Sequence, residues 1–141
     1  MSNNVDILTY EAEGFMPVMT FQSWRLAYLN HCDSVAQDTP AIRVERHMKT
    51  DEVFVLLAGS ATLIIGGSGD TCTAVEVLPM DVGKIYNVKQ FVWHHIILSP
   101  DARVLIVEEA DTSEENTQYT VLSNELRDCI IGQVKCECGS S

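Results

Sequence analysis

A rhythm of short apolar strands, from Ala41 to Glu108, is the feature that most limits what this chain can fold into. Runs of β-branched and apolar residues alternate there with turn residues, and helical periodicity is nearly absent. Glycines in AGS at 58–60 and GGSGD at 66–70 permit the positive φ of tight hairpins. The block predicts an all-β antiparallel sandwich or barrel. The expected strands are 41–47, 52–58, 61–66, 73–78, 84–88, 91–98 and 103–109, with a further one around 24–29.

A short helix is expected after this block, in the segment SNELRDCIIG at 123–132. Ser123 is the expected N-cap, because its hydroxyl can accept a hydrogen bond from a free backbone amide of the first turn. Gly132 can end the helix. An apolar stripe at helical spacing would pack on the barrel wall. It consists of Leu122, Leu126 and Ile130.

The length of 141 residues fits one domain with a core of its own. We expect this domain to span 1–135, with the core barrel at about 22–110, the helix at about 123–131 and a disordered tail at 136–141. Cys136 and Cys138 lie close enough in sequence to chelate a soft metal. Because no second cysteine pair accompanies them, we interpret them as oxidation-prone free thiols.

The charge of the chain excludes one class of partner. A net charge of −11, from 20 acidic and 9 basic residues, repels a phosphate backbone, so we expect no nucleic-acid partner. The N-terminus has no basic segment followed by an apolar one, and no run approaches about 18 apolar residues. We therefore expect a cytoplasmic protein without a membrane partner, acting on a small molecule.

Polar residues share one face of a predicted strand. In AIRVERH, alternation places Arg43, Glu45 and His47 on the same side, because successive side chains point oppositely. In FVWHHIIL it sends His94 and His95 to opposite sides, so that only one of them can face a given cavity. Charges at the mouth of a buried strand are costly unless something compensates them.

Two half-motifs at this spacing resemble those of the cupin family, over about the central half of the chain. The first is matched by Glu45, in place of a histidine, and by His47, Glu52 and Gly59. The second keeps its opening glycine and its histidine at Gly83 and His94. It departs from the family at Lys89, Phe91 and Leu98, which stand where cupins have proline, glycine and asparagine.

The resemblance implies an antiparallel cupin-type jelly-roll β-barrel whose motif residues converge on a metal. His47, Glu52 and His94 would bind a divalent Mn, Fe, Zn, Ni or Co ion, with Glu45 as a fourth ligand or as a catalytic base. The alternative is a metal-free barrel in which Glu45 and His47 form a hydrogen-bonded pair with Arg43 or Thr50.

A narrower resemblance, carried by Tyr86, Trp93, His94 and His95, is to ureidoglycolate lyase-like cupins. It implies a lyase or isomerase acting on a small polar metabolite that bears a carboxylate. Tyr86 would be the catalytic proton donor and a substrate-binding residue, and Arg43 would bind the carboxylate. The alternative is that Tyr86 is a core residue with a satisfied hydroxyl and that Arg43 is the partner of Glu45. The rival function is a non-catalytic cupin that binds a small ligand or serves assembly without metal.

Apolar residues on the outward faces of the strands suggest an association surface. Ile42, Val44 and Trp93 would form a larger patch than a monomer usually exposes, so we expect a homodimer formed through one sheet.

Overall fold

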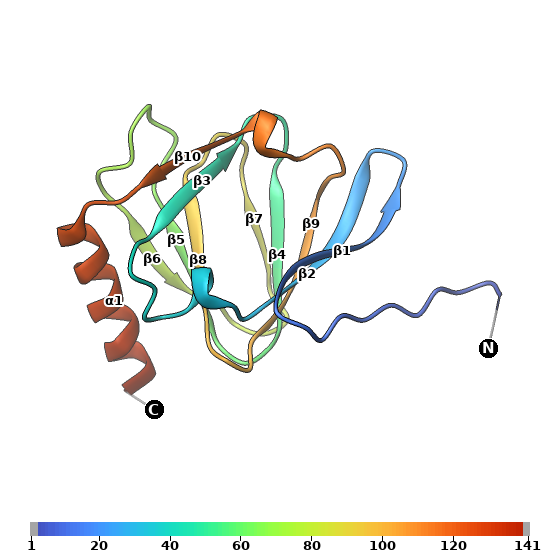
Figure 1. Cartoon of the computed structure of the whole chain (residues 1–141), viewed down its shortest axis with the longest axis horizontal. Coiled ribbons are helices and arrows are strands. Elements are labelled where there is room, and N and C mark those ends of the chain that lie inside the picture. Colours follow the sequence, from blue (N-terminus) through green and yellow to red (C-terminus); the bar gives the residue numbers. More distant parts are fainter. Residues whose placement is uncertain (1–2, 140–141) are drawn as a thin grey trace.

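Two antiparallel sheets packed face to face form the body of the molecule (Figure 1). The computed structural model describes the backbone of residues 3–139 and the side chains of residues 3–136. One sheet has the strand order β1-β2-β9-β4-β7 and the other β10-β3-β8-β5-β6. The strands are β1 Gly14–Phe21, β2 Trp24–Asn30, β3 Arg43–His47, β4 Glu52–Ala58, β5 Ala61–Ile65, β6 Glu76–Pro79, β7 Ile85–Val88, β8 His94–Leu98, β9 Arg103–Glu109 and β10 Thr117–Val121.

The chain crosses repeatedly between the sheets, so that strands distant in sequence become neighbours, as in a jelly roll. Alternation along each strand sends one set of apolar side chains into the space between the sheets. This inner core includes Leu29, Phe54, Leu63, Val104 and Ile106, all buried. The all-β fold class is therefore confirmed.

All eight expected strands are present, with boundaries within a few residues of the prediction. Strands β1 and β10 were not predicted. In β1, Pro17 interrupts the apolar pattern, and the pairing with β2 shifts register between Pro17 and Met19. An edge strand tolerates this, because its outer side carries no ladder hydrogen bonds. Two short 3-10 helices, Asp33–Val35 and Glu114–Asn116, lie in the connections before β3 and before β10.

The C-terminal helix α1, Asn124–Gly139, is longer than predicted. Ser123 caps it as expected: its hydroxyl accepts a hydrogen bond from the Leu126 backbone N–H at 3.2 Å. Gly132 does not end the helix but lies inside it, so the helix continues through residues 136–139 of the expected tail. Residues 140 and 141 of that tail lie outside the described residues.

Helix α1 covers the outer face of the sheet that contains β3 and β8 (Figure 1). Ile130 and Val134 pack there against Ile42, Val44 and Trp93, which are all buried. The expectation that these three strand residues form an exposed dimerisation patch is therefore wrong. A longer helix than the sequence indicated supplies the apolar cover within the same chain.

No helix among residues 3–139 is long and apolar enough to cross a membrane. The cysteines with described side chains, Cys32, Cys72, Cys129 and Cys136, are free thiols. The side chain of Cys138 lies outside the described residues, and the prediction about the Cys136 and Cys138 pair therefore also lies outside them.

Candidate metal centre

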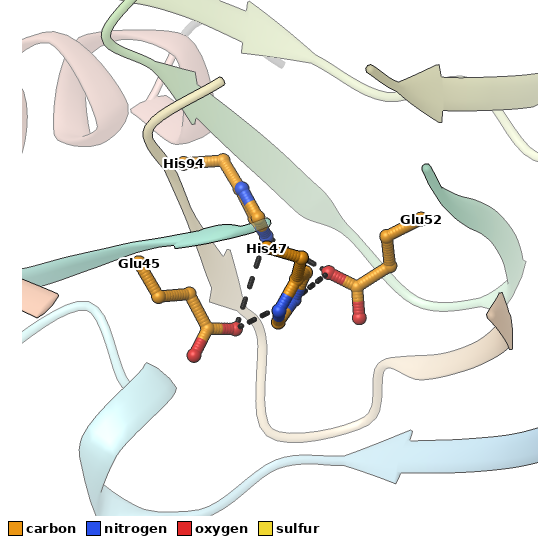
Figure 2. A group of neighbouring side chains, drawn as sticks. All are labelled: Glu45, His47, Glu52 and His94. Carbon is orange, nitrogen blue, oxygen red and sulfur yellow. Dashed lines mark hydrogen bonds and ion pairs between the residues drawn. The ribbon is translucent and has the colours of Figure 1, made fainter. Parts of the chain in front are cut away.

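Four side chains converge inside one end of the barrel: Glu45, His47, Glu52 and His94 (Figure 2). Their potential ligand atoms all lie within 4.8 Å of one another. Glu52 Oε1 is 3.0 Å from His47 Nε2 and 2.8 Å from His94 Nε2. Glu45 Oε1 is more distant, at 3.7 Å and 3.8 Å from the same two nitrogens. Both sheets contribute to this quartet.

The strand register explains why these residues meet. Glu45 and His47 share a face of β3, and Glu45 lies directly opposite His94 in the ladder between β3 and β8. Glu52 is the first residue of β4, in the other sheet. The connection between β3 and β4 is fixed by Asp51, whose carboxylate accepts hydrogen bonds from the Asn87 side chain at 3.0 Å and from the Gln90 backbone at 2.9 Å.

The ring of His94 has a defined orientation. Its Nδ1 lies 2.9 Å from the Val92 carbonyl, which can only accept, so Nδ1 carries a proton. In the neutral ring Nε2 then holds a lone pair directed at Glu52, which suits a metal ligand. Without a cation, Nε2 needs a second proton to donate to the carboxylate. The arrangement therefore favours either an imidazolium or an ion at this point.

Electrostatics in the quartet favour charged forms of three groups. Burial opposes the charge of Glu52, but hydrogen bonds from His47 and His94 outweigh it and hold the pKa of Glu52 well below its usual range. Burial likewise opposes charge on both histidines, and the hydrogen bond to Glu52 prevails, so the pKa of each histidine is raised. Burial and the neighbouring Glu52 charge raise the pKa of Glu45. The site is thus built to neutralise the carboxylate of Glu52.

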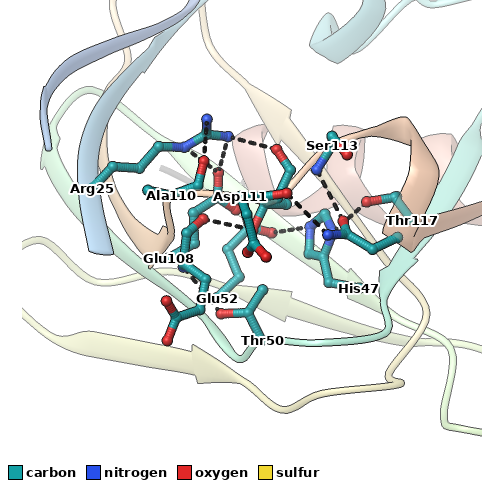
Figure 3. A network of polar contacts seen from close by, with 12 residues as sticks. Arg25, His47, Thr50, Glu52, Glu108, Ala110, Asp111, Ser113 and Thr117 are labelled. Carbon is teal, nitrogen blue, oxygen red and sulfur yellow. Dashed lines mark hydrogen bonds and ion pairs between the residues drawn. The ribbon is translucent and has the colours of Figure 1, made fainter. Parts of the chain in front are cut away.

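A second layer of polar groups surrounds the quartet (Figure 3). Thr117 Oγ1 lies 2.9 Å from His47 Nδ1, and Glu108 lies against Glu52 on the other side. Burial and the Glu52 charge raise the pKa of Glu108 to about 7, although Arg25 forms an ion pair with it at 2.8 Å. Outer contacts of this kind fix the orientation of metal ligands.

Sequence reasoning missed Arg25, Glu108 and Thr117, although alternation contained a signal for two of them. Glu108 follows the inward residues Val104 and Ile106 at period two in β9. Arg25 precedes the inward Ala27 at the same period in β2. A charged residue in register with core positions marks a buried polar site.

A cavity of about 520 Å³ opens onto the quartet. Its volume is suited to a small metabolite. Arg43 lies at the exposed side of this cavity, with its guanidinium 4.2 Å from the ring centre of Tyr119. The stacking on Tyr119 holds the guanidinium where it can contact a ligand. Arg43 thus lies where the sequence placed it, on the face of Glu45 and His47.

Tyr86 is not brought to this site. It points inward from β7, but its hydroxyl accepts a hydrogen bond from the Asp81 backbone N–H at 2.8 Å, and it is not among the described residues that line the cavity. Tyr86 points into the same space between the sheets as the quartet, but it lies farther along the sheet. The predicted role of Tyr86 as proton donor is therefore not supported by its position. The alternative weighed for it, a core residue with a satisfied hydroxyl, matches its contacts.

The histidine pair divides as strand alternation predicts. His95 lies opposite Ile64 in the ladder between β5 and β8, and Ile64 belongs to the core under helix α1. His95 is among the residues that line the cavity but does not belong to the quartet. Phe91, at a glycine position of the cupin motif, has φ +72°, the left-handed conformation that favours glycine. The backbone turn of the motif is therefore present although the residue differs.

No protein-family model and no curated protein matches the sequence. Solved structures share the fold. QdtA 3,4-ketoisomerase from Thermoanaerobacterium thermosaccharolyticum, a double mutant in complex with TDP, has a TM-score of 0.53 and 16% identity over 67% of this chain; the chain spans only 64% of that protein. Streptomyces Pac13 with uridine, described as a nucleoside dehydratase, gives 0.54 and 11% identity over 82% of this chain and 86% of that one. A cupin-2 domain containing protein from Shewanella frigidimarina has a TM-score of 0.48 and 14% identity, over 71% of this chain and 84% of that one.

The topology agrees on the class of fold with the two likenesses whose TM-scores are above 0.5. The chain has a cupin-type jelly-roll fold with a C-terminal helix, as predicted. Its quartet of two imidazoles and two carboxylates has the donor set of a divalent transition-metal site and can bind such an ion. The identity of the ion is not fixed by these donors, because Mn, Fe, Zn, Ni and Co all accept them.

Proposed function

We propose that this protein is a metal-dependent enzyme of the lyase or isomerase type that acts on a small polar metabolite bearing a carboxylate. The observation that carries the proposal is the convergence of His47 Nε2 and His94 Nε2 on one oxygen of Glu52, at 3.0 Å and 2.8 Å, beside a cavity. Two imidazoles and one carboxylate with open positions suit catalysis by a bound ion.

In this proposal the residues around the cavity have three different roles: metal ligand, base and substrate-binding residue. His47, Glu52 and His94 hold the ion, which acts as a Lewis acid when bound. Glu45 lies farther from both imidazoles and is more exposed than Glu52, so it is available as the proton acceptor at the cavity wall. Arg43 binds the substrate carboxylate through its fork of donors, held in place by Tyr119.

Lyase or isomerase chemistry is consistent with this set, because it needs a base and an electrophile but no electron acceptor. The cupin-type fold hosts an isomerase and a dehydratase among the proteins compared above, although fold alone does not assign a reaction. A ureidoglycolate lyase-like activity remains one specific form of the proposal. Its sequence support is weakened, because Tyr86 lies away from the cavity.

The test is the metal content of purified variants after dialysis against a mild chelator, measured by elemental analysis. His47→Ala and His94→Ala should each lose most of the metal, because two remaining ligands rarely retain a labile first-row ion. Glu45→Gln separates its two roles: retained metal with lost turnover makes Glu45 the base, and lost metal makes it the fourth ligand.

His95→Ala is the matched control, since it removes a neighbouring imidazole that points to the opposite side of β8. It should keep the metal. A wild-type protein that never carries metal, yet binds small carboxylates through Arg43, would instead support the rival function, a non-catalytic ligand-binding cupin. That rival is favoured by one observation, the departure of the second half-motif at Lys89, Phe91 and Leu98.

A further inference from the structure

A second, smaller cavity of about 260 Å³ lies between the two sheets, beside the edge strands β6 and β7. Strand β7 ends one sheet and β6 ends the other, so no ladder closes the space between the sheets at this edge. We call this cavity the edge pocket. Its apolar walls are Leu63, Ile65, Leu78, Tyr86, Val88 and Val92.

The strand register places the edge pocket directly behind the wall that carries the metal quartet. Ile65 lies opposite His94 in the ladder between β5 and β8, and Val88 lies opposite Glu52 in the ladder between β4 and β7. Residues opposite each other in a ladder point to the same face of the sheet. Each of these two quartet residues therefore has a neighbour, one strand further on, that lines the edge pocket. The two cavities have no described lining residue in common, so they are separate sites.

The walls of the edge pocket leave apolar surface uncovered. Four of the wall residues pack against the inner core but are only partly buried: Ile65, Leu78, Tyr86 and Val92. The ring of Tyr86 is held in place, because its hydroxyl accepts a hydrogen bond from the Asp81 backbone N–H at 2.8 Å. An apolar cavity of about 150 Å³ in a protein core can bind benzene. The volume of the edge pocket therefore admits one aromatic ring or a branched alkyl group.

The rim of the edge pocket carries one charged residue, the exposed Lys89. No carboxylate is among the described residues that line the pocket, although the chain has 20 acidic residues and 9 basic ones. Hydrogen bonds from Asn87 and Gln90 lower the pKa of Asp51, and Lys89 adds only a smaller electrostatic contribution. Within the described part of the chain, Lys89 forms no hydrogen bond and no ion pair. Its ammonium group is therefore available to an anionic ligand.

We infer that the edge pocket binds a small carboxylate whose apolar body is one aromatic ring or a branched alkyl group. The apolar body fills the space between Leu78, Tyr86 and Val92, which removes their uncovered surface from water. The carboxylate stays at the rim beside Lys89, because a charge placed between the apolar walls would lose its hydration without compensation. The inference does not depend on the proposed function, since neither the metal ligands nor Arg43 line this pocket.

Titration of the wild-type chain with phenylacetate, followed through the methyl signals in NMR spectra, tests the inference. The methyl signals of Leu63, Ile65, Leu78 and Val92 should shift until they saturate, with a dissociation constant at or below about 1 mM. Acetate lacks the apolar body and should not shift them at the same concentrations. Toluene lacks the charge and should shift them with an affinity that does not depend on Lys89.

Two variants separate the apolar walls from the charge at the rim. Leu78→Trp fills the pocket from the edge strand β6 and should abolish the saturable shifts of the remaining methyl signals, with circular dichroism as the check on its fold. Lys89→Gln should raise the dissociation constant of phenylacetate about two- to fivefold and leave that of toluene unchanged. Arg43→Gln is the matched control. It removes a guanidinium from the larger cavity, so the affinity of the edge pocket for phenylacetate should not change.

Three results would overturn the inference. The first is a wild-type chain whose edge-pocket methyl signals do not shift to saturation with phenylacetate. The second is a phenylacetate affinity that Arg43→Gln lowers and Lys89→Gln leaves unchanged, which would place the ligand in the larger cavity. The third is a set of methyl signals that move on dilution of the protein alone, which would show that a second copy of the chain covers the pocket.

Discussion

Gly59, which closes the first half-motif, shows how one position constrains the barrel at the residue scale. Its φ is +73°, and an added Cβ would lie 2.6 Å from the backbone N and Cα of Ala102. Backbone atoms cannot move aside as a flexible side chain can. Gly59→Ala should therefore lower the free energy of unfolding by at least about 3 kcal/mol, since a clash adds to the left-handed penalty. Urea denaturation measures this. Gly67→Ala is the control, because Gly67 has φ +72° but no atom within 4 Å of the added Cβ, and it should cost only about 1–2 kcal/mol.

At the scale of elements, strand β8 contains a buried histidine, His95, that makes the fold sensitive to acid. Nε2 of His95 is buried and has no hydrogen-bond partner among the described residues, and burial together with the nearby His94 lowers the pKa of His95 to about 4. The unfolded chain, with a pKa of about 6.5, binds the proton first as pH falls, so folding loses stability between pH 6.5 and 4. The loss should reach about 2 kcal/mol at pH 5. His95→Gln should remove this part of the pH dependence in urea titrations at pH 7.5, 6 and 5. Equal slopes for the two proteins would contradict it.

At the scale of the whole molecule, the quartet joins the two sheets: Glu45, His47 and His94 come from one sheet and Glu52 from the other. An ion that binds only the folded state stabilises it by about 2.7 kcal/mol when its concentration is 100 times the dissociation constant. Removing the ion with a chelator should lower the thermal midpoint by roughly 5–10 °C for a chain of this length. Scanning calorimetry measures the shift. His47→Ala should show no response to the chelator, and a wild-type midpoint that is indifferent to chelator and to added metal would count against a metal centre.

The alternation of apolar and polar residues along each strand could be recognised in the sequence. It determined the seven strands of the central block and the strand before it, the shared face of Glu45 and His47, and the opposite orientations of His94 and His95, because period-two patterning depends only on neighbouring residues. The half-motifs then added Glu52. Strand β10 was missed because its short, polar TQYTV segment carries little apolar alternation.

Only the tertiary structure decided which distant strands became neighbours. It brought Arg25 and Glu108 to the quartet from β2 and β9, and it left Tyr86 on β7 outside the cavity although this residue points inward. It also extended α1 over one outer sheet face and left the other without that cover. These outcomes depend on strand order and on burial by non-local segments, which the pattern within a single strand does not encode.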